Sequence, residues 1–407
     1  MTKKDILELK RRLKKNECTF TKMCGCYVDG NKNIILNINE TFLNLEDDEF
    51  YKYLEIAKKV LSGTLGNNIL ELEFSATDED MSMQKYLYGL KDSKLKNEAL
   101  LQRLYEQIIK NYDYAGNYLI LIFHDAYDVI TRSSDNSKLD ESEEVYEYIL
   151  CAVCPVELTE AGLGYREDEN RIGVRNRDWV VEMPETGFVF PAFTDRSSDI
   201  HSIMYYTKNA KKPHSEFMED ILNCIPKRTI AEEKEIFNSI IKDSIEQKDE
   251  KDDIYIEIQK NLNSVAEEMV SFTALDDDAL VLTNEKIHKV VSESNIPENV
   301  KEKIEKLYES EFTQAPPLFK NLIDEKAIAE NEQKEKTKEL QKQVQSLKSE
   351  LEEINSEKNI HSAIILNCPE EKAAKIRPQI IDGQKYIIVP VDDGETANIN
   401  GVDIDFL

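Results

Sequence analysis

The most apolar stretch of the chain, residues 118–206, is divided into short runs by Gly, Pro, Asn and Asp clusters. Short apolar runs between turn signals are typical of β-strands, and a continuous run indicates a strand that is buried on both faces. We therefore predict a polar loop and five strands, the loop at 133–144 and the strands at 118–123, 146–156, 179–183, 188–193 and 203–206. Such strands require a sheet that other elements cover on both sides.

Segments that would cover this sheet come earlier in the chain. Apolar residues recur at helical spacing in three of them, residues 5–15, 50–61 and 98–112. Residues 18–38 are typical of a β-hairpin, and residues 69–74 alternate as a half-buried strand does. We predict a mixed or antiparallel central sheet with flanking helices over about residues 18–207, in a domain of residues 1–214.

After residue 214 the pattern becomes helical. Spacings of three and four predict helices at 216–224, 231–246, 255–269, 284–292 and 299–312. These helices form a module of residues 215–320, in which we interpret the acidic run 246–253 as a solvated loop. A polar helix (321–359) and a small β unit (360–407), with hairpin turns at Asp382-Gly383 and Asn400-Gly401, complete an α+β fold.

The polar helix carries a narrow apolar seam. Its members alternate spacings of four and three: Leu340, Val344, Leu347, Leu351 and Ile354. This is the a/d pattern of a coiled coil, over about two heptads. The seam is compatible with a homodimer, and equally with a single helix that packs on its own protein.

Composition limits the class of protein. The 407 residues include 80 Asp plus Glu and 52 Lys plus Arg, which gives a net charge of −28. The 41% of hydrophobic residues is enough to build cores and excludes wholesale disorder. No run reaches the roughly 18 apolar residues that span a bilayer, and the first segment, residues 1–16, is charged and lacks the apolar core of a signal peptide. The seven cysteines are an odd number spread over a long chain, which does not indicate a disulfide framework. We expect a cytoplasmic protein with reduced thiols and no membrane association.

Five of the cysteines could in principle bind zinc: Cys18, Cys24, Cys26, Cys151 and Cys154. The last two form a CxxC motif inside a predicted strand, where residues three apart face opposite sides of the sheet. The alternative is that these thiols are ordinary small core residues.

The loop after the strand 188–193 holds a dense group of reactive side chains. Asp195, Asp199 and His201 could bind a divalent metal ion, and His124, at the end of another strand, could join them across the sheet. The alternative is a turn in which Asp and Ser cap backbone amides and Arg196 pairs with a carboxylate, with His124 as a hydrogen-bonded core residue.

Basic residues cluster on either side of the predicted sheet strands. They are Arg171, Arg175, Arg177, Arg196, Lys208, Lys211 and Lys212, and the only tryptophan, Trp179, follows the first three. In an acidic chain such clusters form the best footprint for a phosphate backbone. The alternative is that they make intramolecular ion pairs.

Four stretches resemble an uncharacterised bacterial family of unknown function over nearly the whole chain: 24–30 (CGCYVDG), 148–151 (YILC), 177–184 (RDWVVEMP) and 193–201 (FTDRSSDIH). The order of the segments 117–122, 146–153 and 217–224, followed by a helical module and a terminal β unit, is similar to that of acidic nucleoid-associated proteins of bacteria. That resemblance implies a cytoplasmic protein that associates with chromosomal DNA and is not an enzyme.

Motifs of the common enzyme classes are missing from the sequence: it has no GxxxxGK[ST], no GxGxxG after a strand, no HExxH and no GxSxG. We therefore expect no cofactor and a non-enzymatic protein that associates with nucleic acid or with a partner that processes it. A metal-dependent hydrolase or nuclease built on Asp195, Asp199 and His201 is the first alternative. An oligomeric scaffold is the second.

Overall fold

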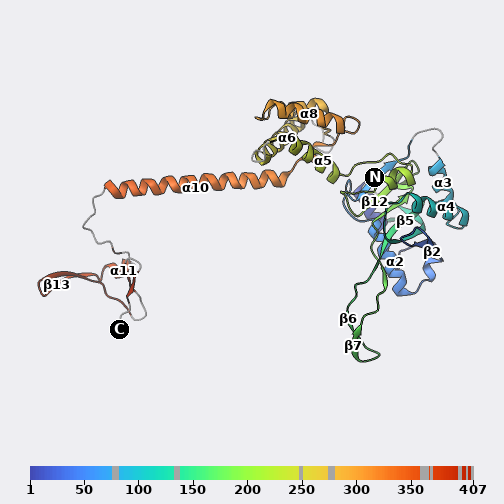
Figure 1. Ribbon diagram of the computed structural model, residues 1–407, viewed down its shortest axis with the longest axis horizontal. Coiled ribbons are helices and arrows are strands. Elements are labelled where there is room, and N and C mark those ends of the chain that lie inside the picture. Colours follow the sequence, from blue (N-terminus) through green and yellow to red (C-terminus); the bar gives the residue numbers. More distant parts are fainter. Residues whose placement is uncertain are drawn as a thin grey trace. The chain divides into compact units, whose positions relative to one another are not determined.

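The computed structural model describes residues 1–75, 82–132, 138–246, 251–273, 280–357, 366, 370–392, 397–399 and 402–404 (Figure 1). The chain divides into two compact units, Met1–Ala329 and Glu330–Leu407. The first unit combines a sheet with flanking helices and a helical module, and the second contains small β-hairpins. The predicted α+β class is confirmed.

Among the described residues, eight strands form one sheet in the order β2-β1-β4-β5-β9-β12-β3, and β8 pairs with β5. All of these pairings are antiparallel. The strands are β1 (Lys22–Val28), β2 (Ile34–Glu40), β3 (Ile69–Glu73), β4 (Asn117–Arg132), β5 (Lys138–Leu158), β8 (Trp179–Val181), β9 (Thr186–Phe190) and β12 (Ser202–Thr207).

Two apolar cores cover the two faces of this sheet. Because side chains alternate along β4, Ile120 and Ile122 join one core while Leu121 and Phe123 join the other. The first core includes α3 (Ser82–Asp92), α4 (Glu98–Asn111) and the π-helical turn η2 (Phe217–Ile221). The second includes α1 (Lys3–Arg12), the short η1 (Phe42–Asn44) and α2 (Asp47–Val60). Burial of the central strands on both faces is therefore confirmed.

Two local predictions in the sheet region were wrong, and two elements were not predicted. The predicted loop 133–144 is strand from Lys138 onward, because β4 and β5 stay paired as far as Arg132↔Lys138, and a paired ladder needs no apolar alternation. The predicted strand 188–193 breaks into β9 and β10 (Ala192–Thr194) at Pro191, which has no N–H for the ladder. Helix α3 and the hairpin β6–β7, described below, were missed.

Close approach of β1 to β4 requires a glycine at position 25. A Cβ atom there would lie 2.3 Å from the backbone oxygen of Ile120. We expect Gly25→Ala to lower the free energy of unfolding by about 1–3 kcal/mol, the usual cost of overpacking. Urea unfolding measures this effect, with Gly30→Ala as the control because its Cβ would have no neighbour closer than 3.4 Å. Equal midpoints for the two variants would contradict the prediction.

The helical module has a core of its own, formed by residues between Phe237 and Leu322. Its helices are α5 (Ile230–Ser244), α6 (Lys251–Thr273), α7 (Asn284–Ser292), α8 (Glu298–Phe312) and α9 (Phe319–Leu322). A capping box begins α5, where Thr229 Oγ1 accepts from the backbone N–H of Glu232 at 3.1 Å. The loop prediction for 246–253 was wrong from residue 251 onward, because the acidic residues Asp252 and Asp253 stabilise the first turn of α6.

The long helix α10 (Glu325–Glu357) leads into the second unit. This unit also holds α11 (Glu370–Ala373) and the antiparallel pairs β13 (Arg377–Ile381) with β14 (Gln384–Ile388) and β15 (Ala397–Ile399) with β16 (Val402–Ile404). Asp382 and Gly383 both have positive φ, 49° and 81°, so the predicted hairpin turn is confirmed. The predicted turn at Asn400-Gly401 lies outside the described residues.

Candidate nucleic-acid interface

Between β5 and β8 the chain makes a hairpin, which we call the arm: β6 (Leu163–Arg166) and β7 (Arg171–Val174). Figure 1 shows the arm extending away from the sheet. Its register pairs Leu163 with Val174, Gly164 with Gly173, Tyr165 with Ile172 and Arg166 with Arg171. Because opposed residues share a face and successive pairs alternate, the arm has two chemically different faces.

One face of the arm consists of glycine and arginine. It contains the pairs Arg166↔Arg171 and Gly164↔Gly173, and then Arg175, whose backbone N–H donates to Gly162 at 2.8 Å. A Cβ atom at Gly173 would lie 3.4 Å from Arg166 Nε and 3.5 Å from Arg171 Nη1. The glycines thus leave room for guanidinium groups to lie flat along the ribbon.

The opposite face of the arm is apolar and open to solvent. Leu163, Tyr165, Ile172 and Val174 are 74%, 61%, 64% and 68% exposed. An isolated two-stranded ribbon is only marginally stable in water, and these side chains bury little area within it. The apolar face of the arm is therefore an uncovered surface in this structure.

The arginines of the arm differ in how firmly they are held. Arg166 and Arg171 both pair with Glu169, and Arg177 Nε donates to the backbone oxygen of Thr159 at 2.8 Å. Within the described residues the Arg175 side chain makes no ion pair or hydrogen bond. The ion pairs of Arg166 and Arg171 with Glu169 lie at the surface, where such pairs contribute about 0–1 kcal/mol, so a phosphate group can replace the Glu169 carboxylate.

Trp179 lies outside the arm, and so do the basic residues Arg196, Lys208, Lys211 and Lys212. Trp179 is the first residue of β8 and is 55% exposed. Lys208 and Lys211 form exposed ion pairs with Glu185 and Glu235, at 3.1 and 3.2 Å, and Lys212 is exposed after the end of β12. Arg196 instead pairs with Glu8 of α1 at 3.2 Å, where both side chains are largely buried. Its role is to hold α1 to the sheet domain.

The loop that contains Asp195 is a tight hairpin between β10 and β11 (Ser197–Asp199). Asp195 and Arg196 both have positive φ, the conformation of a two-residue type I′ turn. Asp199 Oδ1 accepts from the backbone N–H of His201 at 3.0 Å, and the His201 ring lies 3.3 Å from Gln84 Nε2. In the described part of the chain, no three His, Cys, Asp or Glu side chains are placed to hold a metal ion.

His124 is fully buried and bonds to residues other than those of that loop. Its Nδ1 lies 2.7 Å from Thr21 Oγ1 and its Nε2 lies 3.0 Å from Glu147 Oε1. Burial lowers the pKa of His124, although Glu147 opposes this effect. Lys91 Nζ donates to the other oxygen of Glu147 at 3.2 Å. These partners are 23 to 103 residues away in sequence, so no local spacing signals them.

Asp125 points to the opposite face of the sheet and forms a second polar cluster. It pairs with Arg12 at 3.2 Å and accepts from Tyr148 Oη at 2.7 Å and from Thr19 Oγ1 at 2.5 Å. The Arg12 guanidinium also lies 3.7 Å from the centre of the Tyr127 ring. Sequence reasoning missed this cluster for the same reason.

The five cysteines considered for zinc do not converge. Cys24, Cys26 and Cys151 lie in the core on one face of the sheet, and Cys18 and Cys154 lie in the core on the other. Burial raises the pKa of Cys18 and Cys24 to about 11 and of Cys26 to about 12. Within the described residues no three His, Cys, Asp or Glu side chains are placed to hold a metal ion, so we interpret these buried thiols as core side chains.

A comparison with models of protein families assigns the chain to a family. A family model described as a domain of unknown function, DUF4317, matches residues 1–402 of the 407. The chain belongs to this family. The DUF4317 match includes the sheet, the arm, the helical module and the β13–β14 hairpin of the second unit. No curated protein matches the chain.

Within the described residues, no helix of this DUF4317 protein is both long and apolar enough to span a bilayer.

Proposed function

We propose that this DUF4317 protein is a non-enzymatic, cytoplasmic protein that associates with duplex DNA through the glycine–arginine face of the arm. The observation that carries the proposal is the segregation of Arg166, Arg171 and Arg175 onto one face of a projecting two-stranded ribbon. The major groove of B-DNA, about 12 Å wide, admits such a ribbon. Arginine suits phosphate contacts because its planar guanidinium can donate two parallel hydrogen bonds.

Because the net charge of the chain is −28, DNA binding must depend on the positive charges close to the contact. Carboxylates away from the arm repel DNA at long range, but at physiological salt the screening length is about 8 Å, so groups at the arm decide the contact. These groups include Glu169, whose ion pairs with Arg166 and Arg171 must give way to phosphate contacts. The exposed Trp179 at the base of the arm adds an aromatic surface. A-form RNA has a deep and narrow major groove, so we expect duplex RNA to bind more weakly than duplex DNA.

The first prediction tests this interface directly. Replacing Arg166, Arg171 and Arg175 by alanine should lower duplex DNA affinity at least about tenfold, and should reduce the slope of log affinity against log salt by up to about three, roughly one per lost phosphate contact. Fluorescence anisotropy with a labelled duplex across a salt series measures both quantities. A labelled RNA duplex of the same sequence tests the preference for DNA.

The matched control removes the same charge from another surface. Lys85, Lys96 and Lys110 are exposed in or beside α3 and α4, and their replacement by alanine should leave DNA binding nearly unchanged. The proposal fails if the wild-type protein does not bind DNA even at low salt. It also fails if both triple variants lose affinity equally, because the effect would then be one of net charge.

A second proposal concerns assembly. We infer that the protein forms a homodimer through α10, whose four described seam residues Leu340, Val344, Leu347 and Leu351 are 51–60% exposed. A polar helix gains little from leaving such a stripe in water, and pairing with a second copy covers it.

A further inference from the structure

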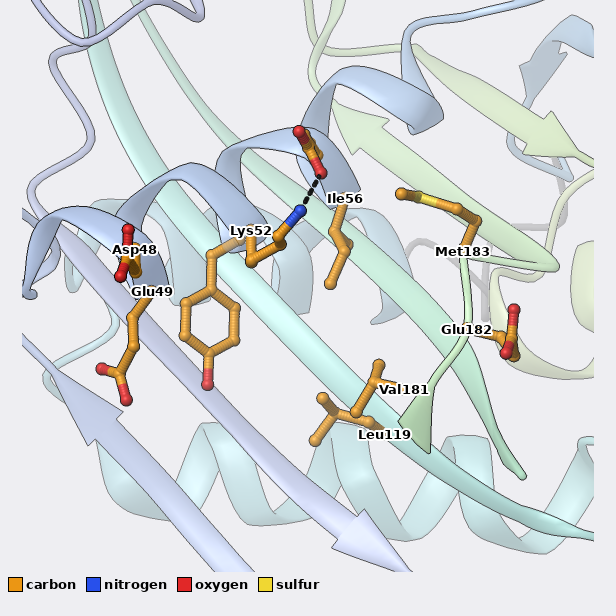
Figure 2. A pocket seen from close by; sticks show the side chains of 10 residues that line it. Asp48, Glu49, Lys52, Ile56, Leu119, Val181, Glu182 and Met183 are labelled. Carbon is orange, nitrogen blue, oxygen red and sulfur yellow. Dashed lines mark hydrogen bonds and ion pairs between the residues drawn. The ribbon is translucent and has the colours of Figure 1, made fainter. Parts of the chain in front are cut away.

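A pocket of about 430 Å³ lies between α2 and β8, over β4 (Figure 2). Its apolar lining consists of Tyr53, Ile56, Leu119, Val181 and Met183. Figure 2 shows Asp48 and Glu49 along α2 on one side and Glu182 beside Met183 on the other, with Leu119 and Val181 between them. A mostly apolar lining with a few charged groups, at this volume, is typical of small-molecule sites. The pocket is separate from the glycine–arginine face of the arm.

The charged groups around the pocket are predominantly negative. Four carboxylates line it and one ammonium, Lys52, so the formal charge is 1 − 4 = −3. Lys52 Nζ already pairs with Glu55 at 3.2 Å. Within the described residues Asp48, Glu49 and Glu182 make no ion pair. Three carboxylates beside an apolar pocket favour a cation and disfavour an anion.

The position of these carboxylates follows from the fold. Asp48 and Glu49 belong to the first turn of α2, where negative charge is stabilised by the helix dipole. Burial raises the pKa of Tyr53, and Glu49 and Glu40 raise it further, so this phenol stays protonated and can donate a hydrogen bond. An apolar body with a positively charged head would therefore meet apolar surface inside and carboxylates at the rim.

We propose that this pocket binds a small amphiphilic cation, an alkyl- or arylammonium compound whose apolar body lies against Ile56, Leu119 and Val181. Its ammonium group then lies at an acidic end of the pocket, beside Asp48 and Glu49 or beside Glu182. The site is independent of DNA binding by the arm.

Three ligands with one apolar chain and different heads test the charge requirement. Octylammonium, octan-1-ol and octanoate are titrated into the full chain by calorimetry, with the fluorescence of Trp179, two residues before Val181, as a second signal. We expect affinity to fall in that order, with octylammonium at least about tenfold tighter than octanoate. Equal affinity of the three, or tightest binding of octanoate, would overturn the proposal.

Two variants separate the rim from the interior of the pocket. Glu49→Gln combined with Glu182→Gln should remove most of the preference for octylammonium while octan-1-ol binds as before. Val181→Asn should weaken all three ligands, and it is tolerated because Val181 is 42% exposed. Octylammonium binding that Val181→Asn leaves unchanged would place the ligand elsewhere and would also refute the site.

Discussion

Replacement of Asp125 by alanine is expected to destabilise the sheet by about 3–5 kcal/mol, because it leaves the Arg12 guanidinium without its carboxylate. The Asp125 side chain is 1% exposed and that of Arg12 is 13% exposed, so water reaches neither group well. The Tyr148 hydroxyl, which donates to Asp125, is buried as well and would also lose its acceptor. Urea unfolding, together with hydrogen exchange of the β4 and β5 amides, measures the loss.

Further variants of Arg12 and Asp125 show whether the ion pair or the packing of these side chains causes the loss of stability. Arg12→Met should cost less than Asp125→Ala, because Asp125 keeps hydrogen bonds from Thr19, Tyr148 and the Ala126 amide. The double variant Arg12→Met with Asp125→Ala removes both charges and should be more stable than Asp125→Ala alone. A double variant as unstable as the sum of its single changes would show that packing, and not the ion pair, is responsible.

Periodic apolar spacing made much of the fold predictable. Helix α7 has the bounds that the spacing indicated, Asn284–Ser292. The same signal was present in α3, where Met83, Leu87 and Leu90 recur at spacings of four and three, and would have identified this helix. Fold class and element type therefore follow from local pattern wherever an element has a buried face.

The arm was hidden because its residues contradict strand preference. Glycine is depleted in strands in general, so Gly164 and Gly173 weaken the strand signal. The apolar residues of β6 and β7 also alternate over only four positions each. The glycine–arginine face of the arm depends on the strand register, which places arginine opposite arginine and glycine opposite glycine. Contacts such as Arg12 with Asp125, 113 residues apart, depend on tertiary structure alone.

The final prediction concerns how two copies of α10 would pair. From 334 to 342 the helix has four lysines and two glutamates, 4 − 2 = +2, and from 343 to 357 it has one lysine and four glutamates, 1 − 4 = −3. Antiparallel pairing places the positive half of one helix beside the negative half of the other, whereas parallel pairing places like charges together. We therefore expect an antiparallel dimer.

In an antiparallel arrangement the seam is self-complementary. Leu340 of one copy packs against Leu351 of the partner subunit, and Val344 packs against the partner's Leu347. Leu347→Glu should raise the dimer dissociation constant by about a thousandfold, since two leucines worth about 2 kcal/mol each leave the interface. Sedimentation velocity over a concentration series measures this change. Gln345→Glu introduces the same side chain off the seam and should leave the dimer intact.

Cysteine cross-linking determines the orientation. A mixture of Leu340→Cys and Leu351→Cys chains should form a disulfide between the two variants, while Leu340→Cys alone should form none, because antiparallel helices keep the two copies of position 340 apart. Both variants also carry Cys368→Ser, because this cysteine belongs to the second unit, whereas burial keeps the thiols of the first unit protonated and unreactive. Cross-linking of Leu340→Cys with itself would indicate a parallel dimer, and a wild-type monomer would mean that the exposed seam does not drive self-association.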